Sequence, residues 1–307
     1  MTAPTADAGG ATGSGATGSG AADTPAGPAP DAPAAPARPR RTISWFRQAV
    51  RLTRTEFTLF VRYKTAWMFL ALPMFLLVFS LGMESYEVFP GVDSTAMSMA
   101  GTLGSIGLIV GLGHASNVFT ARRESLVLKR LRVSGVPQAA IFGAIIGVVA
   151  LFSLLVGVLI TAVTAAFTGS MPQDPLMLMV AVVLSTVPMT LLGLLITPMV
   201  RNAEAAQMAA MVPMMILLFL GGLFVPLSML PDPLREVMML LPVAPVTLTA
   251  QAAFTGYDVF GGFEAATQPG YLGLWAAALP SIGVVLAWTV VLALLVRKFF
   301  KWDPRQP

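Results

Sequence analysis

Long apolar runs alternate with shorter polar segments along most of the chain, from about residue 65 to residue 296. A helix needs roughly twenty mainly apolar residues to cross a hydrocarbon layer of about 30 Å. The run at 97–116 is glycine-rich and less apolar than the others, and is the weakest candidate by hydropathy alone. The pattern predicts an all-α membrane protein with six transmembrane helices, at Thr65–Met83, Met97–Ser116, Ala139–Phe167, Leu176–Val200, Ala205–Val225 and Tyr271–Val296.

The segment 120–137, between the second and third predicted spans, is basic and amphipathic. Lys and Arg near the ends of spans resist translocation, so this segment is expected to stay in the cytoplasm. Of the 19 Lys and Arg residues, all but Arg235 then fall on the cytoplasmic side, which also places both termini there. The charged residues of the segment are Arg122, Arg123, Glu124, Lys129, Arg130 and Arg132.

Two different regions precede the first predicted span. Residues 1–40 are almost wholly Ala, Gly, Pro, Thr and Ser, which predicts a disordered cytoplasmic tail, acting as a spacer or as a recognition element. From residue 41 apolar and basic positions alternate at helical spacing, which suits an amphipathic helix lying in the membrane interface and in contact with lipids. An ordinary basic flank that orients the first span is the alternative. The aromatic and basic residues that carry this prediction are Phe46, Phe57, Arg47, Arg51 and Arg54.

The loop from Pro226 to Gly270 is the longest on the predicted outer side. It contains two apolar stretches, Leu234–Leu241 and Val246–Phe254, separated by prolines. A long apolar loop is expected to dip back toward the membrane or to cap the outer mouth. The sequence therefore predicts re-entrant extracellular helices before the sixth span, and a short cytoplasmic tail at 303–307.

Composition narrows the chemistry. The chain is 56% apolar and 11% charged, against about 25% charged in soluble domains, so a single water-soluble domain is excluded. Its net charge of +4 is explained by membrane topology, so no nucleic-acid partner is expected. Cysteine is absent, and the single His114 is expected to be a polar residue at a helix end or, alternatively, a proton site.

Motifs for catalysis or nucleotide binding are missing from the sequence. It contains no GxxxxGK[ST], HExxH or GxSxG, and the predicted spans contain essentially no charged residues of the kind that proton relays use. We therefore expect no cofactor or metal bound by this chain and no enzyme activity. Glu204 is expected to interact with the N-terminus of the fifth span, where a helix favours a carboxylate. Gly104, Gly107 and Gly111 predict close helix packing within the chain or at a subunit interface.

At 123–131 the sequence resembles a type-2 ABC exporter permease. These permeases show Arg-Glu-x-Gly-Thr-Leu-Lys/Glu-Arg-Leu after the second span, and here the run reads RESLVLKRL, with Leu126 and Val127 in place of Gly and Thr. GGLFVP at 221–226, MLP at 229–231 and LPVAP at 241–245 resemble the family's later proline-rich steps. The Arg that often follows is missing at 251–254, so no role is carried over to that position. The resemblance covers residues 43–300 and is nearest to the daunorubicin-resistance type.

The resemblance implies a type-2 ABC transporter transmembrane domain at 41–302, in the plasma membrane of a bacterium. Such a subunit pairs with a second permease, either a copy of itself or a paralogue, and with separate ATPase subunits that carry ATP and Mg²⁺. The basic segment at 120–137 would be the cytoplasmic coupling helix that docks on the ATPase. The complex would export a hydrophobic or amphiphilic drug, antibiotic or lipid. An ion-coupled carrier, a membrane scaffold or an enzyme acting on lipid-linked substrates are the alternatives.

Overall fold

The computed structural model describes Val50, residues 53–55, 57–58, 64–223, Leu227 and residues 230–301, with side chains from Phe69 onward in the first long helix. The predicted tails at 1–40 and 303–307 lie outside this part of the chain, as do Phe46, Arg47 and Arg51 of the predicted interfacial helix. All described residues belong to the unit that runs from Ile43 to Pro307.

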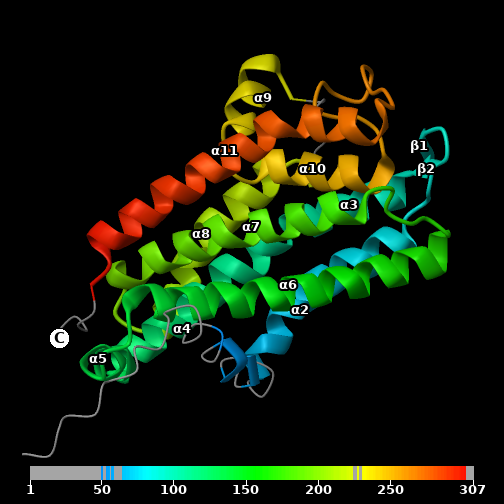
Figure 1. The fold of residues 1–307 in the computed structure, drawn as a ribbon. Helices are drawn as coiled ribbons and strands as arrows, with labels where there is room; N and C mark the ends of the chain where they lie inside the picture. Colours follow the sequence, from blue (N-terminus) through cyan, green and yellow to red (C-terminus); the bar gives the residue numbers. More distant parts are fainter. Residues whose placement is uncertain are drawn as a thin grey trace, which may run out of the picture. The chain divides into compact units, whose positions relative to one another are not determined.

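Helices make up most of the described structure (Figure 1). In chain order they are α2 (Lys64–Gly82), α3 (Ser94–Gly107), the π-helix η1 (Leu108–Leu112), α4 (Gly113–Glu124), α5 (Val127–Val133), α6 (Gln138–Thr168), α7 (Pro175–Ile196), the 3₁₀-helix η2 (Thr197–Met199), α8 (Ala203–Leu220), α9 (Asp232–Met239), α10 (Ala244–Thr255) and α11 (Gly270–Phe299). A short antiparallel hairpin, β1 (Glu87–Phe89) and β2 (Val92–Asp93), lies at one end of the bundle, and α5 lies at the other. We call these the hairpin end and the segment end.

Five helices among the described residues are long and apolar enough to cross a membrane: Ser94–Glu124, Gln138–Thr168, Pro175–Met199, Ala203–Leu220 and Gly270–Phe299. They coincide with the second to sixth predicted spans. The first predicted span coincides with α2, whose described apolar stretch, Phe69–Gly82, is shorter than the others. Its place as a sixth span stays a prediction.

The fifth span is shorter than the sequence suggested. The apolar run continues to Val225, but α8 ends at Leu220 because Gly221 and Gly222 follow it. Gly222 adopts φ +82°, the left-handed conformation that terminates helices and that glycine adopts without steric cost.

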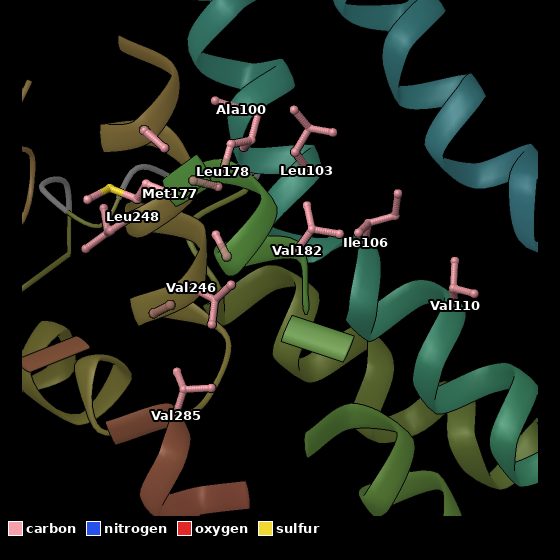
Figure 2. Packing of buried hydrophobic residues seen from close by; sticks show 14 of the residues in the cluster. Ala100, Leu103, Ile106, Val110, Met177, Leu178, Val182, Val246, Leu248 and Val285 are labelled. Atoms are coloured by element: carbon pink, nitrogen blue, oxygen red, sulfur yellow. The ribbon is translucent and has the colours of Figure 1, made fainter. Parts of the chain in front are cut away.

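The second span is the most enclosed of the five long helices. In its apolar window 94% of residues are buried inside the chain, against 22% in the window of α11. It packs against α7 and α10, and Figure 2 shows Leu103, Ile106 and Val110 on this span facing the same core as Val182 of α7 and Val246 of α10. A helix surrounded by protein needs no strongly apolar surface, which explains its weak hydropathy.

Glycines allow this close packing. A Cβ added at Gly104 would lie 2.6 Å from Cα of Thr247 on α10, and one at Gly107 would lie 2.3 Å from the carbonyl carbon of Ser185 on α7. The amide of Gly107 also donates to Oγ of Ser185 at 3.2 Å. Of the two alternatives left by the sequence, packing within the chain is therefore the one observed at these positions.

The long loop before the last span contains helices at both expected stretches. α9 and α10 meet at an angle of 87°, and α10 is buried along its whole length against α3, α7 and α11. Trp288, roughly 18 residues and thus about 27 Å into α11, donates from Nε1 to the carbonyl of Leu240 at 2.6 Å. The turn between α9 and α10 therefore reaches well down the side of α11, as a re-entrant segment would.

Aromatic contacts close the hairpin end. Phe89 of β1 stacks on Tyr257 with ring centroids 4.6 Å apart, and the Tyr257 hydroxyl donates to the carbonyl of Pro90 at 3.3 Å. The Asp174 carboxylate caps α7 by accepting from the amide of Met177 at 2.9 Å, and also accepts from Nε1 of Trp275 at 2.7 Å. These contacts tie the hairpin to the loop after α10, and the start of α7 to the first turns of α11.

Candidate coupling segment and its contacts

The predicted coupling segment, residues 120–137, contains a helix end, a short helix and two turns. α4 ends at Glu124, α5 spans Val127–Val133, and α6 begins after Pro137. Gly135 adopts φ +82° in the turn after α5. Leu128 is fully buried beneath α5 and joins the main core, so the short helix has a fixed position against the bundle.

Leu126 occupies a left-handed conformation between α4 and α5, with φ 57° and ψ 13°. It is the non-glycine residue with positive φ among the described residues. A side chain in this region costs roughly 1–2 kcal/mol, a cost that glycine does not have. The exporter motif has glycine at this position, so the backbone follows a glycine conformation although the residue is leucine.

Arg123 is buried, with 1% of its surface exposed. Its Nη2 donates to the backbone carbonyl of Val200, in the connection between η2 and α8. The position is enclosed by this chain, so Arg123 holds the end of α4 against the start of α8. Arg123 was predicted as part of the coupling helix, and its side chain contacts α8 within this chain; a role in coupling stays a prediction.

Glu124 contacts the same connection. Its Oε2 accepts a hydrogen bond at 3.1 Å from the amide of Ala203, the first residue of α8. The first amides of a helix have no partner within the helix and carry partial positive charge, so a carboxylate is favourable there. Glu204 lies in the first turn of α8, as the sequence suggested, and is exposed. Glu124, from a different span, is the carboxylate that accepts from the first amide of α8.

Asn117 adds a third link, about two turns before the end of α4. Its Nδ2 lies 3.4 Å from the carbonyl of Ala203 and 3.4 Å from Oε1 of Gln207. Asn202 caps α8 by accepting from the amide of Ala205 at 2.8 Å. We call the contacts of Asn117, Arg123 and Glu124 with residues 200–207 the α4–α8 clamp. Sequence reasoning missed Asn117 and Val200, since only folding brings residues about 80 positions apart together. It also missed Asn202, although an Asn directly before a helix is a local capping signal.

The remaining cations of the segment lie at the surface. Lys129, Arg130 and Arg132 on α5 are exposed, and Arg122 at the end of α4 is half-buried. Val133 is also exposed, at 82%, beside these charges. α5 thus presents one apolar face to the bundle and a basic face away from it, a suitable surface for an acidic partner.

The segment end also includes the first described helical turns and the end of α11. Phe119 of α4 and Phe142 of α6 both contact the ring of Phe300, at 6.0 and 5.2 Å between centroids. Phe57, predicted to lie in lipid, is partly buried and packs against Val148 of α6. Arg54 is exposed. The first described turns therefore contact α6 through Phe57, in addition to any contact with the membrane interface.

His114 lies inside the second span, 8% exposed, with its ring edge-on to Phe69 at 5.8 Å between centroids. In the described part of the chain no three His, Asp or Glu side chains come close enough together to hold a metal ion.

A bundle of long apolar helices with a basic connecting helix at one end defines the chain as a multi-pass α-helical membrane protein. The chain belongs to the family of ABC-2 family transporter proteins, whose model matches residues 74–298. The match includes the coupling segment, the α4–α8 clamp and both helices before the last span. No curated protein matches the chain at a significant level. It is therefore a membrane permease subunit of an ABC transporter, a class that works with an ABC ATPase subunit.

Proposed function

We propose that this permease exports a hydrophobic or amphiphilic compound across the bacterial plasma membrane, driven by ATP hydrolysis in a partner subunit. The α4–α8 clamp carries the proposal. An ATPase that moves α5 also moves the end of α4, and the contacts of Arg123 and Glu124 pass that displacement to the start of α8. ATP and Mg²⁺ would be held by the partner, and a second permease, identical or paralogous, would complete the pathway.

Orientation follows from charge. The segment end carries Lys129, Arg130, Arg132 and Arg201, while the hairpin end carries acids such as Glu87 and Glu264. Lys and Arg flanking spans remain in the cytoplasm. The segment end would therefore face the cytoplasm, with both termini on that side, and the hairpin end would face outward.

The test is charge reversal on α5, in the triple variant Lys129→Glu, Arg130→Glu and Arg132→Glu, co-expressed with its ATPase. These side chains are exposed, so the fold is preserved while a basic docking surface becomes acidic. Co-purification of the ATPase should fall at least tenfold. Arg201→Glu, at the same end but outside the segment, is the matched control and should retain the ATPase. Wild-type co-purification by the triple variant would refute α5 as the docking element.

A further inference from the structure

A cavity of about 560 Å³ opens near the hairpin end, between α2, α3, the connection after α8, α9, α10 and the loop 257–263. Its volume lies in the range of sites for drug-sized ligands. Most of its wall is apolar, with Phe79, Met83, Met97, Leu248, Phe260 and Phe263 among the lining residues.

Gln251 of α10 is a largely buried polar residue in this wall. The residue is 6% exposed, and the remaining surface opens onto the cavity. Its backbone carbonyl accepts from Thr255, but no described residue forms a hydrogen bond with its side-chain amide. A side-chain amide in the cavity wall that forms no hydrogen bond with the described residues can donate to and accept from a bound ligand. Gly101 of α3 makes room for it, because a Cβ there would lie 3.3 Å from Nε2.

Two serine hydroxyls of the wall, Ser80 on α2 and Ser98 on α3, also have no hydrogen-bond partner among the described residues. Two threonine hydroxyls of the wall, by contrast, are already used within the chain. Thr102 donates to the carbonyl of Ser98 at 3.1 Å, and Thr95 donates to Oγ of Ser85 at 3.2 Å. Three helices therefore each contribute one unused polar group to an otherwise apolar space.

The charged lining residues do not select a charged ligand. Glu84 and Arg235 have opposite signs, and Arg235 pairs with Asp232 at 3.3 Å. The unused groups are all neutral donors or acceptors. Their combination with apolar walls suits an uncharged body that carries a carbonyl or hydroxyl group.

We propose that this cavity binds a neutral amphiphile of drug size, with Gln251 as the residue that recognises its polar group. The inference rests on the proposed function, because an outward cavity of this chemistry would hold the compound during export. It adds the residues that would bind the transported compound and the charge class of that compound, both of which the family assignment leaves open.

The absence of cysteine provides a direct test, since one introduced thiol is then the only thiol in this chain. Met239→Cys places it in the wall of the cavity, and Val237→Cys places it on the same helix but outside the wall. Both are alkylated with N-ethylmaleimide in lipid nanodiscs, with and without Nile red, a neutral amphiphile that carries a carbonyl. At several times its half-protecting concentration, Nile red should slow Met239→Cys alkylation about fivefold and leave Val237→Cys unchanged.

Gln251→Leu in the Met239→Cys background removes the amide at nearly constant volume. The Nile red concentration for half-protection should rise about five- to tenfold, the effect of losing one hydrogen bond. Gln251→Asn, which retains an amide but withdraws it by one methylene, is the second variant and should weaken protection at least threefold. Equal alkylation of Met239→Cys with and without Nile red overturns the proposal, as does undiminished protection in a folded Gln251 variant.

Co-purification of the ATPase is measured on the same preparations. If the ATPase co-purifies but Nile red does not protect the thiol, the proposed binding cavity alone is refuted. If the ATPase does not co-purify with the wild-type protein, the proposed ATP-driven function is refuted instead.

Discussion

Gly107→Ala is the sharpest test of the central packing. A Cβ at this position would lie 2.3 Å from the carbonyl carbon of Ser185 and 2.4 Å from the amide nitrogen of Thr186. Both atoms belong to the backbone of α7, so no side-chain rotation relieves the contact. Carbon atoms pack at about 3.5 Å or more, so α3 and α7 must separate by roughly 1 Å at this level.

The expected loss combines three effects. Overpacking costs about 1–3 kcal/mol, and the hydrogen bond from Gly107 to Ser185, already 3.2 Å long, costs about 1 kcal/mol when the helices separate. Alanine recovers about 1 kcal/mol of helix propensity. The net loss is about 1–3 kcal/mol, and at about 2–4 °C per kcal/mol the midpoint of unfolding should fall by about 3–10 °C.

Gly283→Ala is the matched control, because a Cβ there meets nothing within 4 Å and the position is exposed on α11. It should unfold at the wild-type temperature or slightly above. The five tryptophans provide a fluorescence signal for thermal unfolding, whereas thiol-reactive dyes have no target in this chain. If Gly107→Ala unfolds at or above the temperature of Gly283→Ala, the close approach of α3 and α7 is wrong.

Three further substitutions test separate parts of the molecule. Leu126→Gly should raise the free energy of unfolding by about 0.5–1 kcal/mol, because it removes the left-handed strain and Leu126 joins no core cluster. Leu126→Ala keeps the strain and should show no gain in thermal unfolding. Asp174→Asn should lower stability by about 1–3 kcal/mol in thermal unfolding, because Met177 and Trp275 donate to different carboxylate oxygens and the amide nitrogen that replaces one of them cannot accept. Glu124→Ala should lower stability by only about 1 kcal/mol and should retain the ATPase. In proteoliposomes it should reduce the Nile red efflux per ATP hydrolysed, and unchanged efflux would contradict the role of the clamp.

Hydropathy located the helices because a membrane requires long apolar runs whatever the fold. It ranked the second span lowest, although this span has the largest buried share of its apolar window among the five long helices. The reason is that lipid-facing helices such as α11 need apolar side chains, whereas a helix enclosed by protein needs small ones such as Gly104 and Gly107. The low hydropathy and the regularly spaced glycines of this span therefore both follow from its interior position, which the sequence alone left open.

The site was only partly predictable for a different reason. Local charge identified the basic face of α5, because Lys129, Arg130 and Arg132 are exposed and lie within one short helix. Arg123 belongs to the same run of charges but is buried, and nothing in its neighbours along the chain distinguishes it. Its partner Val200 contributes only a backbone carbonyl, which leaves no trace in the sequence. In the sequence, Gln251 stood out only because it lies in the stretch 251–254, where the family often has an Arg. That its side-chain amide forms no hydrogen bond with the described residues depends on how α10 packs against α3.

α8 connects the two functional ends of the proposed mechanism. Its first residue, Ala203, is held by Glu124 of the clamp, and the residues directly after its end, Gly222 and Leu223, line the cavity. A helix of 18 residues spans about 27 Å, and an intact helix transmits a displacement along its axis with little compression. Movement of α5 by an ATPase would therefore change the cavity wall through α8, without any chemistry in the spans.

Pro213 removes one backbone hydrogen bond from α8 and is the position where the helix bends most easily. A permease built this way needs an intact clamp for coupling but not for ATPase docking, so the two properties should separate in Glu124→Ala and fail together only when the basic face of α5 is reversed.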